Sequence, residues 1–186
     1  MKIIDILKTC AELLGLTSEL NVLGEITVEN EATKLTENSE VERLFRLSKY
    51  SLQEIATNYF PMRDEAGAVN CSDYDLSLLT NYIRMHGVYE NGSPVDYKII
   101  NKKIVFSKPG TYTIAYYAYP EFESMFDDLD FLENLSPDAL VFSVCSYYSI
   151  AKGMFNEFEE FHNKYVDRIE AIKNMKTFVM PARRWE

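Results

Sequence analysis

The first sixty residues contain two stretches with the hydrophobic period of an α-helix, separated by a stretch without any period. Apolar side chains recur every three or four positions over residues 3–14, and Gly15 follows as a stop signal. The same period runs from Ser39, which opens a Ser-x-x-Glu capping box, to the segment before Pro61. Residues 16–38 mix apolar and polar side chains irregularly, so we expect a long loop there with at most one extended piece.

Near residue 68 the hydrophobic period shortens from that of a helix to that of a β-strand. The expected strands cover residues 68–71, 82–88, 97–100, 103–106 and 111–119. Good turn formers separate them, namely Asn91-Gly92, Asn101-Lys102 and Lys108-Pro109-Gly110. Because such tight turns join antiparallel neighbours, we expect an antiparallel insert at about residues 68–120.

The last third of the chain returns to a helical period. Ser136 and Pro137 suit the cap and the first position of a helix, and residues 139–152 are apolar on nearly every side. A helix without a polar face is a buried helix, so we expect this one to be buried. After Gly153 a long amphipathic helix is expected, with one apolar face formed by Phe155, Phe158, Phe161, Tyr165, Ile169 and Ile172.

These patterns predict a single α+β domain over residues 1–186, mainly helical, with about four helices. Its parts are a helical segment 1–60, the β insert at about 68–120, a second helical segment 136–176 and a C-terminal arm 177–186. With 47% hydrophobic and 13% aromatic residues, the chain is well able to bury a core.

The net charge of −10 is concentrated in the two ends of the chain. Residues 1–60 carry 6 basic and 10 acidic groups, residues 121–186 carry 7 and 13, and the middle third carries 6 of each. Binding through phosphates requires clustered Lys and Arg, so the charge argues against nucleic acid and anionic membranes as partners. Asp5 and Lys8 interrupt the apolar N-terminus, and no stretch of about 18 apolar residues occurs, so we expect neither a signal peptide nor a membrane span.

Residue types that carry catalysis or bind metals are sparse. His86 and His162 are the only imidazoles, and neither has a Cys or a second His at metal-ligand spacing. Three cysteines, far apart in the chain, are typical of reduced thiols inside a cell. The acidic run at residues 127–133 lacks the Gly of a calcium loop, and no phosphate-binding loop or nucleophile elbow occurs. We therefore expect no catalytic residue, no cofactor and no metal site.

One ordered set of segments is more specific than its parts. A helix ends in Asn-Tyr-Phe-Pro (58–61), and two short strands precede a strand that runs from Pro-Gly to Tyr-Pro (109–120). A Leu-Ser-Pro-Asp-Ala-Leu helix start (135–140), the pair Tyr147-Tyr148 and a long helix rich in Phe and Tyr follow, before a basic tail with Arg-Arg-Trp. Over residues 40–185 this order resembles the head–tail connector (adaptor) proteins of tailed bacteriophages, including the tail-tubular adaptors of short-tailed phages.

The resemblance implies a structural virion subunit without enzymatic activity. Such a subunit is assembled in the cytoplasm of the bacterial host, is not secreted, forms a ring with copies of itself and joins the portal to the tail proteins. The viral DNA passes through the ring without specific binding, and no membrane is involved. A negative channel wall repels DNA, which is compatible with the net charge of this chain.

The C-terminal arm holds the candidate interface residues. Trp and Arg are among the residue types that most often dominate interface energetics, and the arm combines the single Trp with two Arg. The candidates are Phe178, Met180, Arg183, Arg184 and Trp185. Two alternatives stay open: an interaction domain of a bacterial cell, and a ligand-binding module in which tyrosines of 112–119 form a platform for a small molecule or a carbohydrate.

Overall fold

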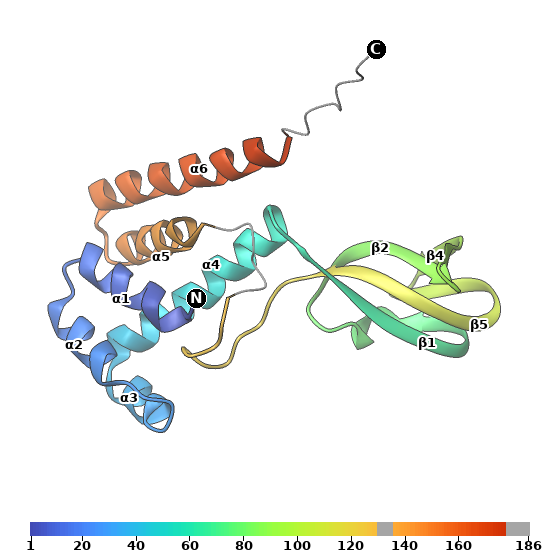
Figure 1. Cartoon of the computed structure of the whole chain (residues 1–186), viewed down its shortest axis with the longest axis horizontal. Coiled ribbons are helices and arrows are strands. Elements are labelled where there is room, and N and C mark those ends of the chain that lie inside the picture. The colour runs from blue at the N-terminus through green and yellow to red at the C-terminus, as the bar shows by residue number, and fades with distance from the viewer. Residues whose placement is uncertain (130–135, 178–186) are drawn as a thin grey trace, which may run out of the picture. The chain divides into compact units, whose positions relative to one another are not determined.

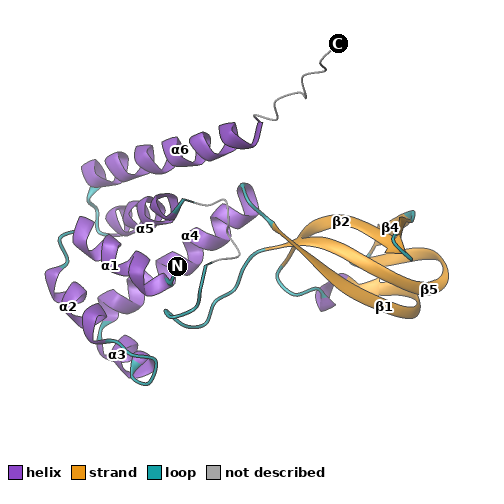
Figure 2. Ribbon diagram, viewed as in Figure 1, coloured by secondary structure: helices purple, strands orange, loops and turns teal. Residues whose placement is uncertain are grey.

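The computed structural model describes residues 1–129 and 136–177, and the chain divides into two compact units (Figure 1). The helical unit comprises Met1–Ser51 and Phe122–Glu186, and the β unit comprises Leu52–Glu121. All the strands described belong to the β unit, as the colours of Figure 2 make clear. In sequence, the β unit is therefore an insertion between the two halves of the helical unit.

Six α-helices lie within the described residues. They are α1 (Ile3–Leu13), α2 (Thr17–Glu25), α3 (Glu31–Glu37), α4 (Ser39–Asn58), α5 (Pro137–Ala151) and α6 (Phe155–Thr177). The helices expected from the hydrophobic period are confirmed as α1, α4, α5 and α6. The α+β class holds, but the prediction of a mainly helical chain with about four helices is wrong. The long loop expected at residues 16–38 is also wrong, because α2 and α3 occupy it.

A contact with a distant part of the chain, rather than a hydrophobic period, holds α3, whereas α2 packs against the neighbouring helix α1. Each helix buries a single residue, Leu23 in α2 and Glu31 in α3. The carboxylate of Glu31 accepts hydrogen bonds from the Ser124 hydroxyl at 2.6 Å and from the Met125 backbone N–H at 2.7 Å. These donors lie 93 and 94 residues further along the chain, so no local pattern reveals them. A buried carboxylate with two donors is satisfied, and it fixes α3 to the segment after the β unit.

The N-terminal cap of α4 differs from the one expected. The side-chain oxygen of Asn38 accepts a hydrogen bond from the backbone N–H of Val41 at 3.1 Å, which makes Asn38 the cap. The expected capping role of Ser39 is therefore wrong by one residue, since Ser39 already belongs to the helix.

The helix α5 is the most buried element of the helical unit, as its sequence predicts. Nine of its residues are buried, including the serines at positions 143, 146 and 149. α1 and α6 both pack against α5, and Gly153, with a φ of 73°, forms the turn from which α6 runs back along it (Figure 1). α6 contributes only one stripe of buried side chains, namely Phe161, Tyr165, Ile169 and Ile172.

The β unit is an antiparallel sheet arranged around its longest strand. Its elements are β1 (Met62–Asp75), a 3-10 turn η1 (Leu76–Leu78), β2 (Tyr82–Glu90), β3 (Ser93–Pro94), β4 (Tyr97–Ile100) and β5 (Lys103–Ala118). β5 is central, because β1 pairs with one of its edges while β2 and β4 pair with the other. The antiparallel insert is thus confirmed, although it begins at Met62 rather than near residue 68.

The expected turn at Lys108-Pro109-Gly110 is wrong, because these residues lie inside β5. The pairing with β1 explains how a strand tolerates Pro109. Gly110 lies opposite Cys71 and Val105 lies opposite Asp73, so β5 has extra residues at a bulge where no ladder N–H is needed. The two expected strands at 103–106 and 111–119 are consequently one strand.

The other two expected turns have the backbone conformation that tight hairpins need. Asn91 and Gly92 have φ values of 52° and 79°, and Asn101 and Lys102 have φ values of 49° and 63°. Two successive residues with positive φ match the twist of the flanking strands, so these pairs close the β2–β3 and β4–β5 hairpins. Both turns are confirmed.

The core of the β unit contains a buried tyrosine with a charged partner. Tyr116 lies on the inner face of β5, and its hydroxyl donates a hydrogen bond to the Asp64 carboxylate at 2.9 Å. Burial, and then the hydrogen bond to Asp64, raises the pKa of Tyr116 to about 12. The bond ties β1 to β5 near the point where the chain enters the sheet.

Replacing Tyr116 with Phe removes the hydroxyl and leaves the ring in the core. We expect Tyr116→Phe to lose about 0.5–1.5 kcal/mol of unfolding free energy at neutral pH, the usual contribution of one hydrogen bond. Because the folded-state pKa is raised, this contribution is complete below pH 10 and is lost as the pH rises towards 12. Urea unfolding should show the difference from wild type shrinking over that range. Tyr117→Phe is the control, and a pH-independent difference for Tyr116→Phe contradicts the assignment.

Candidate functional site

The described residues do not form a metal site. Among residues 1–129 and 136–177, no three His, Cys, Asp or Glu side chains are grouped so that they could hold an ion. His86 lies beside Tyr117 at a ring distance of 5.3 Å, and His162 stacks on Phe158 at 5.4 Å. Within the same residues, no helix is long and apolar enough to cross a membrane.

The cluster around Glu40 has shifted pKa values and a structural role. The carboxylate accepts hydrogen bonds from the Tyr148 hydroxyl at 2.8 Å and from Arg43 at 2.9 Å, and it pairs with Lys152 at 2.9 Å. Partial burial alone would raise the pKa of Glu40, but Lys152, Tyr148 and Arg43 together lower it. Burial, and then Glu40, raises the pKa of Tyr148. The cluster joins the first turn of α4 to the last turn of α5, where the helix dipoles favour an anion and a cation respectively.

Two of the three thiols are buried between α1 and α5. The Cys10 thiol donates to the Val141 carbonyl at 3.7 Å, and the Cys145 thiol approaches the Cys10 carbonyl at 4.0 Å. Burial raises the pKa of Cys10, so its thiol stays protonated and is a poor nucleophile. Cys71 is half-buried in the β unit, and none of the three forms a disulfide.

The turn end of the β4–β5 hairpin exposes apolar side chains on both faces. Ile99 is 49% exposed and Ile100 is 50% exposed, although adjacent strand residues point to opposite faces. Leu78 in η1 is 66% exposed, and a hydrogen bond of 2.9 Å from the Leu76 N–H to the Lys102 carbonyl holds η1 beside the hairpin turn. We refer to Leu78, Lys98, Ile99, Ile100 and Lys102 as the hairpin tip. Exposed apolar residues grouped at one end of a hairpin are a candidate docking surface.

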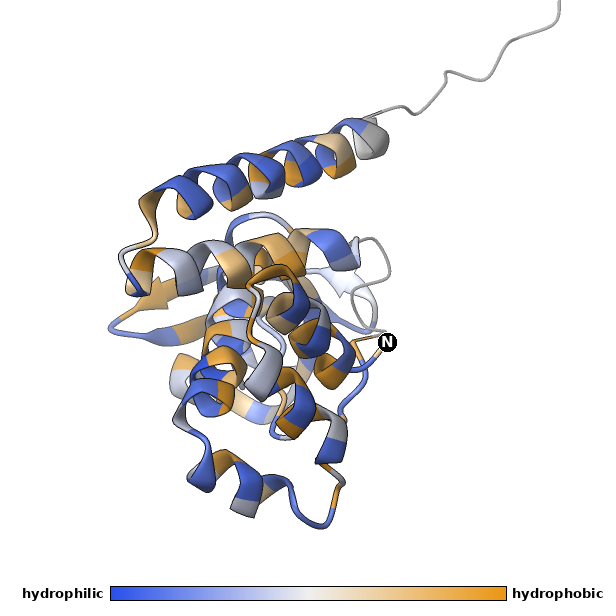
Figure 3. Cartoon of the chain, turned by 90° about the vertical axis from the view of Figure 1, so that its left-hand side faces the viewer, coloured by the Kyte–Doolittle hydropathy of each residue, from blue (hydrophilic) through white to orange (hydrophobic). Residues whose placement is uncertain are grey.

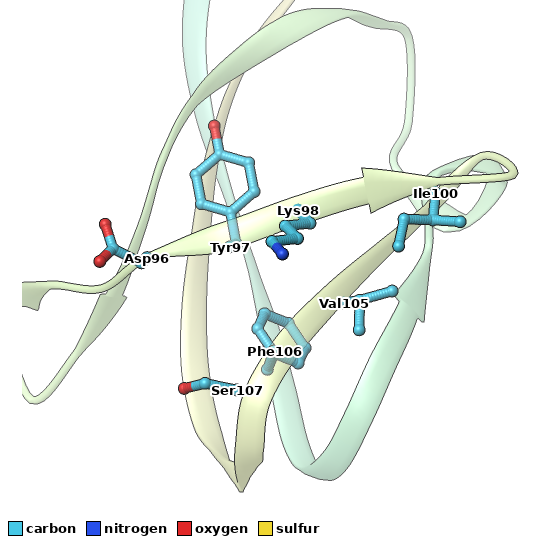
Figure 4. A pocket seen from close by; sticks show the side chains of 7 residues that line it. All are labelled: Asp96, Tyr97, Lys98, Ile100, Val105, Phe106 and Ser107. Carbon is cyan, nitrogen blue, oxygen red and sulfur yellow. The ribbon is translucent and has the colours of Figure 1, made fainter.

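A groove runs along the same hairpin. It has a volume of about 410 Å³ and is lined by residues of β4 and β5 between Asp96 and Ser107. Figure 4 shows Ile100 and Val105 near each other toward the turn end, with Phe106 further along β5. The groove extends the apolar surface of the hairpin tip away from the turn.

Charged side chains of both signs lie around the hairpin tip. A hydrogen bond from the Ser77 backbone N–H lowers the pKa of Asp75, and the charges of Lys103 and Lys102 lower it further. Residues 97–108 contain four lysines and no acidic residue. Lys103 pairs with Asp73 at 3.0 Å and Lys108 pairs with Glu90 at 3.1 Å. Lys98 and Lys102 are exposed and form no ion pair with another described side chain. The apolar side chains of the tip are therefore flanked by two cations.

A second exposed surface lies along α6. Phe155, Glu159, Val166 and Glu170 are spaced by four, seven and four residues, so they share one face of the helix. All four are exposed, with Phe155 at 66% and Val166 at 36%. We call this set the α6 stripe, and it differs from the stripe that packs on α5. Figure 3 shows hydrophilic residues along most of α6, with hydrophobic positions recurring between them.

The sequence-predicted site residues and these surfaces do not coincide. The candidates Phe178, Met180, Arg183, Arg184 and Trp185 lie outside the described residues. The expected tyrosine platform is incomplete, because the core of the β unit buries Tyr112 and Tyr116. Phe155 was assigned to the apolar face of α6 by its period, but it is exposed. The adjacent pair Ile99-Ile100 beside a turn was the one local signal for the hairpin tip.

The chain matches no protein-family model, and no curated protein matches it.

Substitutions in the β4–β5 hairpin separate its exposed tip from its core. We expect Ile100→Ser to change the unfolding free energy by less than about 1 kcal/mol, because half of the side chain is already in water. Ile104→Ala, four residues along and fully buried, should cost about 2–5 kcal/mol through lost packing. Urea unfolding of both variants measures the contrast. Equal losses would show that Ile100 supports the fold rather than a docking surface.

Proposed function

We propose that this protein is a head–tail connector subunit of a tailed bacteriophage, a structural protein of the virion without a catalytic role. The observation that carries the proposal is the hairpin tip, where apolar side chains on both faces of a hairpin are left in water. A protein that acts by docking needs such a surface, whereas a self-contained subunit gains nothing from it. The order of segments over residues 40–185, which resembles that of head–tail connector proteins, supports a connector among the proteins that act by docking.

The proposed partners are further copies of the chain, the portal and the tail proteins. Copies form a ring that joins portal to tail, and the viral DNA passes through without specific binding. The net charge of −10 supports this last point, because a negative wall offers no phosphate sites to passing DNA. The subunit is made in the host cytoplasm and ends in the virion.

A ligand-binding module is the second candidate. The groove along β4 and β5 favours it, since about 410 Å³ falls within the range of about 300–1,000 Å³ that small-molecule sites occupy. A thermal-shift screen with carbohydrates and small metabolites tests this candidate, with Tyr97→Ala as the variant that removes a lining ring. A ligand that raises the melting temperature of wild type but not of Tyr97→Ala favours the module over the connector.

The connector proposal predicts a direct complex with a portal ring. Mixing the protein with the portal encoded beside its gene should add density to one end of the ring in electron micrographs at near-physiological salt. The same mixture with a portal from an unrelated phage is the control. Absence of added density with its own portal contradicts the proposal.

Removing the candidate interface residues should weaken portal binding without lowering the unfolding free energy. A chain that ends at Thr177 lacks Phe178, Met180, Arg183, Arg184 and Trp185. We expect its urea unfolding to match that of the full chain, while portal affinity falls at least about tenfold, or 1.4 kcal/mol. The full-length variant Arg183→Ala/Arg184→Ala separates loss of charge from loss of length. A truncated chain that no longer folds would place these residues in the core of the subunit.

A further inference from the structure

Two thiols face each other where α1 packs on α5, inside the helical unit. Cys10 on α1 and Cys145 on α5 are both fully buried. The Cys10 thiol donates to the Val141 carbonyl at 3.7 Å, and the Cys145 thiol lies 4.0 Å from the Cys10 carbonyl. Val141 precedes Cys145 by about one helical turn, so each thiol lies against the backbone beside the other cysteine.

The two side chains also interact directly. After burial, a hydrogen bond with the Cys145 side chain is the next cause that raises the pKa of Cys10. Cα atoms of α1 and α5 approach within 8 Å of each other, and the small buried side chain of Ala11 adjoins Cys10. A disulfide requires Cα atoms within about 7 Å and side chains that point towards each other. The pair therefore has the orientation of a disulfide precursor, in helices that are close enough for a small adjustment to supply the distance.

A facing pair of thiols offers a chemistry that core packing does not need. A single buried Cys serves as a small apolar residue, and Ala or Val can replace it in that role. Two thiols in contact can in addition be oxidised to a disulfide. The third thiol, Cys71, lies in the β unit, which contains no second cysteine.

We propose that Cys10 and Cys145 are a redox-sensitive pair, which forms a disulfide between α1 and α5 on exposure to a low-molecular-weight disulfide such as glutathione disulfide. The thiolate of one cysteine attacks a sulfur of the oxidant, which forms a mixed disulfide and releases one glutathione. The other cysteine then attacks the protein sulfur of the mixed disulfide and releases the second glutathione. The two thiol hydrogens end on the two glutathione molecules, so the protein is oxidised by two electrons and the oxidant is reduced by two.

Burial makes this exchange slow in both directions. Neither sulfur is accessible while α1 lies on α5, so a molecule of the size of glutathione reaches them only when α1 opens locally. The same cover then shields the disulfide from reductants. In a reducing compartment the chain therefore holds two thiols, and in an oxidising one it slowly acquires a bond that persists.

The disulfide joins the two segments of the helical unit, Met1–Ser51 and Phe122–Glu186. Cys10 and Cys145 are 135 positions apart, so the closed loop is long and contains the whole β unit. Closing a long loop removes much of the entropy of the unfolded chain, and the disulfide should therefore stabilise the folded form. The inference goes beyond the connector proposal and does not rest on it, because it concerns a single copy of the chain.

Equilibration with glutathione tests the proposal in the full chain carrying Cys71→Ser, which removes the thiol that could exchange with the pair. The midpoint of oxidation is the ratio of glutathione disulfide to the squared glutathione concentration. We expect this midpoint to be at least about tenfold lower in buffer than in a urea concentration that unfolds the chain, because folding holds the two sulfurs together.

The product and its stability are measured on the same samples. Mass spectrometry should show the loss of two hydrogen atoms and, after digestion without reductant, a peptide pair joined through Cys10 and Cys145. The melting temperature should rise by roughly 5–15 °C on oxidation and return when a reductant is added.

A variant with one thiol is the matched control. Cys71→Ser/Cys145→Ala keeps Cys10 alone, so it forms at most a mixed disulfide with glutathione, and its melting temperature should not rise. If this variant does not fold, Cys71→Ser/Cys10→Ala provides the same control, and reversal by the reductant needs neither. Equal midpoints in buffer and urea, a joined peptide pair that forms only in urea, or a melting temperature that falls on oxidation overturns the proposal, as does an equal rise in the control.

Discussion

The helical unit depends on covering α5, a helix that has no polar face. Such a helix is stable only when other elements shield it on nearly every side. α1 approaches it closely enough for the Cys10 thiol to contact the Val141 carbonyl, and α6 covers another side with a single stripe of buried side chains. At the last turn of α5, Glu40 gathers Tyr148 and Lys152. The segments before and after the β unit must therefore come together before either has a core.

The same requirement explains why α6 has two faces with different roles. Its buried stripe is limited to the side that meets α5, which α1 also contacts. The remaining circumference of α6 faces water, and most of it is charged. Phe155 and Val166 are exceptions on that outer surface, as Ile99 and Ile100 are on the hairpin. The hairpin tip and the exposed apolar residues of α6 are thus apolar surfaces that the cores of the two units leave uncovered.

The sequence predicts elements with a strong local period and misses those defined by distant partners. α1, α4, α5 and α6 each repeat apolar residues often enough to be recognised, and the hairpin turns are recognised from Asn91-Gly92 and Asn101-Lys102. The sequence does not predict α3, because the helix is held by Glu31, whose carboxylate accepts hydrogen bonds from residues 93 and 94 positions away. β5 is divided wrongly because Pro109 is a turn signal in isolation, and only the register with β1 shows that it lies in a bulge.

The β unit begins and ends at neighbouring points of its own sheet. Met62, the first residue of β1, pairs with Ala118, the last residue of β5, so the two points where the chain crosses into and out of the sheet are about 5 Å apart. A gap of that size is spanned by a short peptide linker. Segments of very different length can therefore occupy this position without altering the spacing that the flanking helical segments experience. The geometry allows the β unit to change in length between these two points without changing their spacing, whereas the helices around α5 are constrained by their packing.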